Sequence, residues 1–290
     1  MIDHVARPIR IPVASAGIEL QVLTRGLDHP GMPMLLVHGL ASNARLWDGV
    51  AERLAAAGHP VAAVDQRGHG QSDKPDSGYD FATLTDDLLT VLHDLGWQTA
   101  WLAGQSWGAN VVLEVGARHP DAAAGLVLVD GGTMELGGRY ADWATCEAVL
   151  APPPLNGTSA ARFEHLVRTN HPDWPESGIA GTLANVEVLG DGTIRPWLSR
   201  SNHMTILRHM WEHRLSERYP LVKIPVLVLP AEDQGNQRWM AGKRQEVARA
   251  GAALERSVTR WIPGDHDLHA QHPDLIAELI HDATGSGLFP

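Results

Sequence analysis

Residues 104–108 read G-x-S-x-G and lie between an apolar run and a run that favours a helix. The apolar run, residues 99–103, predicts a short buried strand, and residues 111–115 predict a buried helix. A serine at such a strand–turn–helix junction lies on a tight, strained turn that exposes its hydroxyl. Glycines fit on either side because a side chain would crowd the turn, and the free N–H groups of the following helix favour negative charge. The pattern predicts Ser106 as a nucleophile.

A serine hydroxyl is a weak nucleophile, so it needs a neighbouring base, and the base needs an orienting carboxylate. The segment 262–269 offers His266 and His269 as bases. Asp233, next to Glu232, follows one apolar run, and Asp130 ends another. Carboxylates at the C-terminal ends of parallel strands lie where such sheets bind ligands. The residues alone leave both choices open.

The elements that must position these groups alternate between short apolar strands and amphipathic helices. Residues 9–26 have the alternating pattern of a β-hairpin at a sheet edge. The alternation predicts an α/β fold, with a mostly parallel central sheet and helices on both faces. Further strands are expected at residues 34–37, 61–65, 126–130, 225–229 and 258–262, and helices around residues 46–54, 84–95 and 273–280.

Residues 131–223 interrupt this alternation and contain several prolines. We expect them to form a mostly helical cap, so that residues 1–130 and 224–290 form the core domain. Tryptophans in a surface layer favour a role in lining a pocket. The segment contains four of them: Trp143, Trp174, Trp197 and Trp211.

The composition limits the partners of the chain. Its 290 residues are 44% hydrophobic and 20% charged, as in a soluble globular protein, and the formal net charge of −11 argues against nucleic acid and anionic membranes as partners. The single cysteine, Cys146, forms no internal disulfide and is expected to pack in the cap. Residues 1–4 begin no signal peptide, and no apolar run is long enough to span a membrane, so we expect a cytoplasmic protein. No pattern indicates an oligomeric state.

Four motifs in chain order resemble those of the α/β-hydrolase family, and their order and spacing cover nearly the whole chain outside the cap. The family's helical cap would correspond to residues 131–223. The motifs are His38-Gly39, the loop of residues 65–72 (DQRGHGQS), the elbow at residues 104–108, and Gly264-Asp265-His266.

The resemblance implies the chain order nucleophile, acid, histidine. Ser106 is then the nucleophile, His266 rather than His269 the base, and Asp233 the acid, with Asp130 as the alternative because some relatives place the acid there. Pro230 departs from the family, which commonly has glycine at that place. The family's oxyanion hole would use the backbone N–H groups of Leu40 and Trp107, as catalysis of acyl transfer requires. Three further residues, His38, Arg67 and His69, are expected to be structural.

Other activities of this fold fit less well. Haloalkane dehalogenases and epoxide hydrolases use an aspartate in the elbow, whereas Ser106 would leave a stable ether. Proline iminopeptidases usually carry His-Gly-Gly-Pro-Gly where this chain has residues 38–42 (HGLAS). Cofactor-free perhydrolases of the haloperoxidase type and carbon–carbon bond hydrolases share the triad and stay open. A non-catalytic binding protein of this fold is disfavoured because serine and histidine are both present.

A metal enzyme is the other class to weigh. Residues 209–213 read H-x-x-E-H, which places His209 and His213 on one helix face, but no neighbouring carboxylate motif completes a metal site. We therefore predict a serine hydrolase that cleaves carboxylic esters or lactones through an acyl-enzyme, with no cofactor or metal. The tryptophan, leucine and methionine content of the cap suggests a small-molecule substrate with an apolar group.

Overall fold

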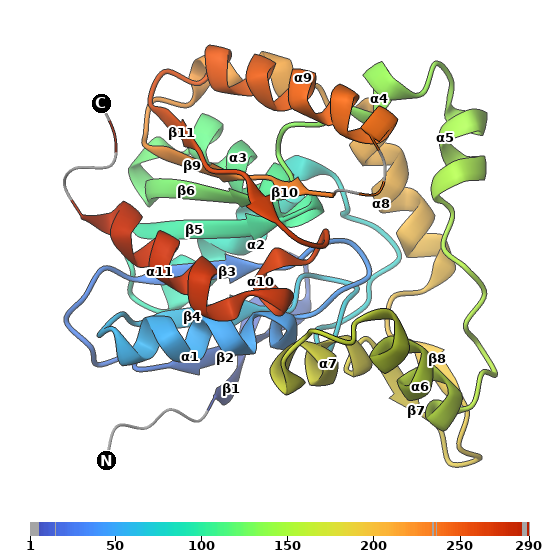
Figure 1. The fold of residues 1–290 in the computed structure, drawn as a ribbon. Coiled ribbons are helices and arrows are strands. Elements are labelled where there is room, and N and C mark those ends of the chain that lie inside the picture. Colours follow the sequence, from blue (N-terminus) through green and yellow to red (C-terminus); the bar gives the residue numbers. More distant parts are fainter. Residues whose placement is uncertain (1–5, 15, 234, 236, 286–288, 290) are drawn as a thin grey trace.

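The computed structural model describes residues 6–14, 16–233, 235, 237–285 and 289. Residues 1–4, for which no signal peptide is expected, lie outside that range. The described residues form an eight-stranded sheet between layers of helices (Figure 1). In spatial order its strands are β1 (Arg7–Val13), β2 (Ile18–Arg25), β4 (Val61–Val64), β3 (Met34–Val37), β5 (Ala100–Gln105), β6 (Ala123–Val129), β9 (Val226–Leu229) and β11 (Ser257–Thr259).

The sheet is parallel from β4 to β11, and β2 pairs antiparallel with both β1 and β4. The β1–β2 register, from Arg7 opposite Thr24 to Val13 opposite Ile18, confirms the predicted edge hairpin. Each residue of β3, β4 and β9 is buried, which is typical of strands covered on both faces. The predicted fold class is confirmed.

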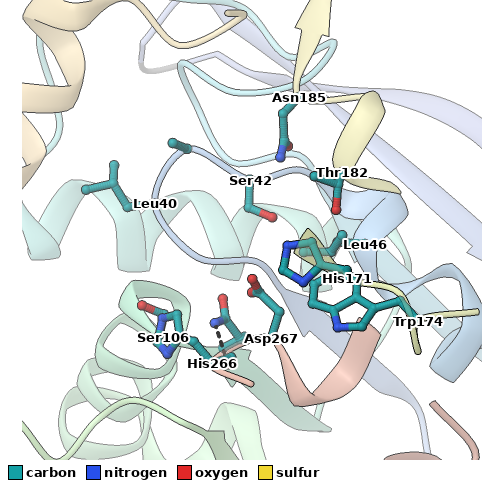
Figure 2. A pocket seen from close by; sticks show the side chains of 12 residues that line it. Leu40, Ser42, Leu46, Ser106, His171, Trp174, Thr182, Asn185, His266 and Asp267 are labelled. Atoms are coloured by element: carbon teal, nitrogen blue, oxygen red, sulfur yellow. Dashed lines mark hydrogen bonds between the residues drawn. The ribbon is translucent and has the colours of Figure 1, made fainter. Parts of the chain in front are cut away.

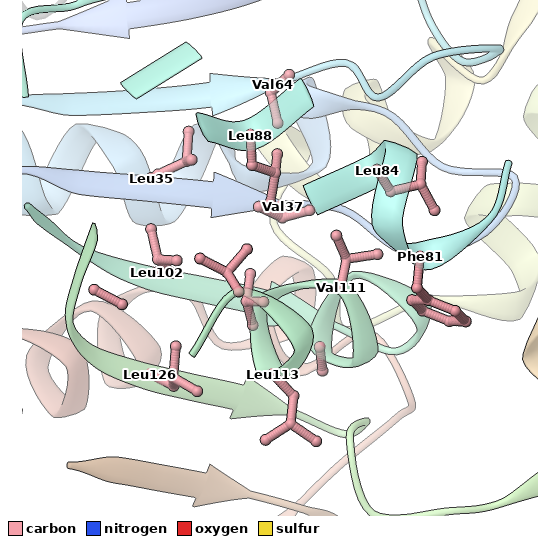
Figure 3. Close-up of a cluster of buried hydrophobic side chains, with 14 of the residues drawn as sticks. Leu35, Val37, Val64, Phe81, Leu84, Leu88, Leu102, Val111, Leu113 and Leu126 are labelled. Carbon is pink, nitrogen blue, oxygen red and sulfur yellow. The ribbon is translucent and has the colours of Figure 1, made fainter. Parts of the chain in front are cut away.

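Successive strand residues enter opposite cores because side chains alternate across a strand. Leu35 and Val64 face the layer of α2 (Phe81–Asp94) and α3 (Trp107–Arg118), as Figure 3 shows. Leu36 and Val61 face the layer of α1 (Asp48–Ala56) and α11 (Pro273–Thr284). Burying one such side chain fully is worth about 1.5–3 kcal/mol, so the two layers fix the sheet.

The remaining core elements are short, apart from α9 (Gln237–Ala253), which contributes Ala250 to the α2–α3 core. They are η1 (Ala44–Trp47), η2 (Pro120–Ala122), β10 (Ala231–Glu232), β12 (Ile262–Pro263) and α10 (Leu268–Gln271). The predicted last strand therefore divides into β11, in the main sheet, and β12, which pairs with β10. No helix in the described part of the chain has the length and apolar character needed to cross a membrane.

The segment between β6 and β9 is mostly helical and lies along one side of the sheet (Figure 1). A two-stranded hairpin, β7–β8, was not predicted. The elements of this insertion are α4 (Leu136–Arg139), α5 (Trp143–Leu150), α6 (Ala160–Asn170), α7 (Glu176–Leu183), β7 (Val186–Val188), β8 (Ile194–Pro196), α8 (Arg200–Glu212), η3 (Leu215–Glu217) and η4 (Tyr219–Leu221).

Candidate active site

Ser106 occupies the turn between β5 and α3 with φ 53° and ψ −118°, a strained conformation for a residue with a side chain. The turn has no room on either side. A Cβ added at Gly104 would lie 2.3 Å from the Gly108 carbonyl oxygen, and one at Gly108 would lie 2.4 Å from that of Val37. Strand, turn and helix thus match the geometry that the sequence predicts for this stretch.

The imidazole of His266 hydrogen-bonds to Asp130, not to Asp233. His266 Nδ1 lies 2.6 Å from Asp130 Oδ2, and Asp130 directly follows β6 with φ 43°. Asp233 is exposed, and its Oδ1 accepts a hydrogen bond from the Gly235 N–H at 2.7 Å. The preference for Asp233 as the partner of His266 is therefore corrected by this geometry to Asp130, the alternative that the sequence left open.

Asp130 is well placed to stay ionised. Its Oδ1 accepts hydrogen bonds from the Ala231 N–H at 2.8 Å and lies 2.5 Å from Lys243 Nζ. Burial alone would raise the pKa of Asp130, but the bond to His266 and the charge of Lys243 outweigh it and lower the pKa. A buried carboxylate that is both charged and hydrogen-bonded holds an imidazole in one orientation.

The pKa of His266 is shifted in the opposite direction. Removing the ring from bulk water lowers the pKa of His266, but the hydrogen bond to Asp130 and the charge of Asp267 outweigh this, so its pKa lies above the ordinary value. The loop that carries His266 is held against the elbow, because Gln105 Nε2 donates to the His266 carbonyl oxygen at 3.2 Å. Ser106 and His266 line the same cavity of about 140 Å³ (Figure 2).

The turn after β3 approaches the elbow from the other side, and two buried histidines shape it. His38 Nε2 accepts from the Gln66 N–H at 3.0 Å, and His69 Nε2 accepts from the Ala41 N–H at 3.2 Å. Their Nδ1 atoms then donate to backbone carbonyl oxygens, which fixes one neutral tautomer for each ring. These bonds give His38 and His69 the structural place that the sequence predicts.

Arg67 braces the neighbouring loop. Its guanidinium forms a bidentate pair with the buried Asp87 on α2, with both nitrogen–oxygen distances 2.6 Å. Leu40 lines the cavity beside Ser106, and Trp107 is the first residue of α3, where a backbone N–H has no partner within the helix. The two proposed oxyanion donors thus come from turns on both sides of the serine.

His269, the other candidate base, does not line the cavity. Its ring packs against Trp47 with centroids 4.3 Å apart, and burial lowers its pKa to about 3. Neither ring nitrogen has a hydrogen-bond partner among the described residues. A neutral, enclosed imidazole of this kind fits packing beneath the loop rather than proton transfer.

Residues of the H-x-x-E-H stretch, 209–213, form salt bridges with other side chains. His213 Nε2 lies 3.1 Å from the buried Glu114, whose pKa falls to about 2: burial opposes that shift, but bonds from His213 and Arg118 prevail. Glu212 pairs with Arg208 instead. Within the described part of the chain, no three histidine, cysteine or acidic side chains gather as metal ligands would. Cys146 is buried among Leu136 and Leu207 of the insertion.

Comparisons with known proteins agree with the architecture. Residues 32–167 match the sequence model of the alpha/beta hydrolase fold. Over 276 residues the chain is 36% identical to 2-(acetamidomethylene)succinate hydrolase of Mesorhizobium japonicum, which covers 91% of this chain and 90% of that protein. The chain belongs to the alpha/beta hydrolase family.

Two further comparisons place this alpha/beta hydrolase among its relatives. Over 115 residues it is 39% identical to epoxide hydrolase A of Mycobacterium tuberculosis, covering 39% of this chain and 35% of that protein. The crystal structure of E-2-(acetamidomethylene)succinate hydrolase superimposes with a TM-score of 0.79 at 24% identity, covering 96% of this chain and 99% of that one. The last likeness concerns the fold alone.

The insertion supplies the cavity wall of this alpha/beta hydrolase that lies opposite the elbow. Of the four tryptophans predicted to face a pocket, Trp174 lines this cavity, whereas Trp143 and Trp211 pack against each other with ring centroids 6.2 Å apart. Trp197 lines a different hollow, between the insertion and the β1–β2 edge. The other insertion residues in the wall are polar: His171, Thr182 and Asn185.

Sequence reasoning missed this polar wall and two residues of the core domain beside it. Ser42 and Asp267 line the cavity with Ser106, and the Ser42 hydroxyl oxygen is buried without a hydrogen-bond partner among the described residues. Asp267 had a usable signal, since it directly follows the predicted base. His171 had none, because only the folded chain brings the end of α6 to the His266 loop.

Proposed function

We propose that this alpha/beta hydrolase is a serine acyl hydrolase in which Ser106, His266 and Asp130 form the triad. The observation that carries the proposal is the 2.6 Å hydrogen bond between His266 and Asp130, at a cavity that the strained Ser106 also lines. This joins a nucleophile, a base of raised pKa and an ionised orienting group at one cavity.

In the first step, Ser106 Oγ attacks the carbonyl carbon while His266 Nε2 takes the hydroxyl proton. The tetrahedral oxyanion accepts hydrogen bonds from the Leu40 and Trp107 N–H groups. Loss of one such donor typically lowers kcat by a factor of about 10²–10³. As the intermediate collapses, His266 returns the proton to the leaving alcohol and the acyl group stays on Ser106. A water molecule, deprotonated by the same imidazole, then opens the acyl-enzyme and releases the acid.

We propose carboxylic esters or lactones as the substrates. A cavity of about 140 Å³ is small beside the usual 300–1,000 Å³ of ligand pockets, which favours a short acyl group. The Mesorhizobium japonicum relative is named for a compound that contains an acetamide, and this supports attack on a carbonyl carbon. Amides of the same size therefore belong in the substrate panel.

The test is a burst of p-nitrophenol from p-nitrophenyl acetate, with mass spectrometry of the quenched protein. We expect a burst stoichiometric with protein and an acetyl group on the peptide that contains Ser106. Ser106→Ala should abolish both while the protein stays folded by circular dichroism. A burst that persists in Ser106→Ala, or an acetyl group found elsewhere, would refute the assignment.

The same assay with hydrogen peroxide separates hydrolysis from perhydrolysis, since both use this triad. We expect ester hydrolysis in water to exceed peracid formation at millimolar peroxide. Peracid formation as the faster reaction would replace the hydrolase proposal by a perhydrolase.

A further inference from the structure

The carboxyl group of Asp267 faces the cavity without a partner. Asp267 directly follows His266 and precedes α10, yet its carboxyl oxygens make no cap to that helix and no hydrogen bond to any described residue. Figure 2 shows its carboxyl oxygens directed toward Ser42 and His171. Burial raises the pKa of Asp267, while the charges of His266 and His171 act in the other direction. A half-buried carboxyl group without a hydrogen-bond partner is a ready acceptor for a ligand.

No lysine or arginine among the described lining residues neutralises Asp267. Of the twelve residues that line the cavity, all of them within the described part of the chain, none is lysine or arginine. The insertion's imidazole is already engaged, because His171 Nδ1 lies 3.2 Å from Asp265 Oδ2. A carboxylate on the substrate would therefore meet the carboxyl group of Asp267 without a lysine or arginine as counter-ion.

We propose that Asp267 is a specificity-determining residue that accepts a hydrogen bond from a substrate N–H or O–H group and excludes substrates with a carboxylate at that place. The inference rests on the proposed acyl hydrolysis and narrows its substrates to neutral or cationic acyl compounds. It also separates this chain from its Mesorhizobium japonicum relative, whose name specifies a succinate. Specificity of this kind comes from a repulsive group as much as from an attractive one.

Three methyl esters of matched size test the proposal: methyl succinamate ends in an amide, methyl levulinate in a ketone, and monomethyl succinate in a carboxylate. Methanol release gives kcat/KM for each. We expect kcat/KM to decrease from the amide to the ketone to the carboxylate, with the value for the amide at least about 30-fold higher than that for the carboxylate. Acetoxyacetamide and acetoxyacetate repeat the comparison with the group on the alcohol side, so that either orientation of the ester is covered.

Asp267→Asn should lower the ratio of kcat/KM for the amide to kcat/KM for the carboxylate by at least about 10-fold. The main cause should be a rise in kcat/KM for the carboxylate. The matched control is Asp265→Asn, which removes the same charge from the other neighbour of His266 but outside the cavity lining. We expect it to change the ratio by less than about threefold, even if it slows all the esters. Ratios near one for both wild-type pairs, or an unchanged ratio in Asp267→Asn, would overturn the proposal.

Failure of the proposed function is recognised separately. If none of the esters acylates Ser106 and a fluorophosphonate does not label it, acyl hydrolysis is wrong. The charge preference is then measured as binding of the intact esters to Ser106→Ala by calorimetry. Tighter binding of the amide than of the carboxylate still supports the role of Asp267, and equal binding overturns it.

Discussion

The two walls of the cavity are built in different ways. The elbow wall, around Ser106, is made of turns at the ends of β3 and β5, which close backbone approaches and bonds from side chains to the backbone hold in place. The insertion wall, around His171 and Trp174, depends on side-chain bonds between segments far apart in the chain. Asp265 Oδ2 accepts a hydrogen bond from Trp174 Nε1 at 2.9 Å and lies 3.2 Å from His171 Nδ1.

We expect the two walls to affect different kinetic constants. Substitutions in the elbow wall should act on the chemical step, because the proposed mechanism brings its atoms to the reacting carbonyl. Substitutions in the insertion wall should act on substrate binding, because its atoms meet the rest of the substrate. Kinetic constants of single variants test this contrast, since a loss of kcat and a rise of KM report different interactions.

The largest effect should come from the carboxylate behind the elbow wall. Asp130→Asn is expected to lower kcat about 10⁴-fold, because an amide can stabilise neither the required tautomer nor the imidazolium of His266. Asp233→Asn is the matched control and should stay within about threefold of wild type, measured with p-nitrophenyl acetate. The reverse ranking of the two variants would restore Asp233 as the triad acid.

Gly39 should give the next largest effect. A Cβ at this position would lie 2.3 Å from Gln105 Oε1, so Gly39→Ala must displace the side chain that holds the His266 loop and shift the Leu40 N–H. We expect kcat to fall about 10²-fold with little change in KM. Gly190→Ala, at a loop glycine without a positive φ and with no described atom within 4 Å of the added Cβ, controls for general effects of the substitution. A Gly39→Ala enzyme with normal kcat would contradict the proposed oxyanion donor.

A smaller effect is expected at the insertion wall. Asp265→Asn weakens the acceptor shared by His171 and Trp174, so KM should rise about 10-fold while kcat changes less than about threefold. Steady-state kinetics with methyl succinamate measure both constants. A loss confined to kcat would mean that both walls serve the chemical step, and the contrast between them would fail.

The smallest effect concerns pH. His266 must be neutral to act as a base, and its pKa is raised, so kcat/KM should fall as the pH drops through a value above 6.5. Asp267→Asn removes one of the charges that raise this pKa, so the acid limb should move to lower pH and activity at pH 6 should rise about twofold for a neutral ester. An acid limb that moves upward would mean that the charge of Asp267 does not act on His266.

The elbow wall was predictable because its signals are local. Ser106 and His266 each lie in a short motif whose neighbours dictate the turn. Asp130 had such a signal too, since a Cβ at the following Gly131 would lie 2.2 Å from the Ser106 carbonyl oxygen, and this close approach brings the end of β6 to the elbow. The motif match favoured Asp233 instead, which lies exposed beyond β10, whereas His266 bonds to Asp130.

The insertion wall could not be predicted in the same way. Its helical character followed from the loss of strand–helix alternation. Which of its side chains reach the cavity depends on tertiary contacts, such as the hydrogen bond from Gln271 Nε2 to Asp173 Oδ2 at 2.5 Å, which joins residues 98 positions apart. Tryptophan content alone therefore suggested a more apolar wall than the fold provides.

The bonds of Asp265 tie the insertion to the peptide unit next to His266, the proposed general base. Any outward swing of the α6–α7 segment that keeps those bonds must pull on the histidine backbone, so admission of a molecule and readiness for proton transfer are mechanically coupled. An exchange of this segment between homologues would have to carry a matching residue at position 265, or the grafted enzyme would lose the alignment of its base.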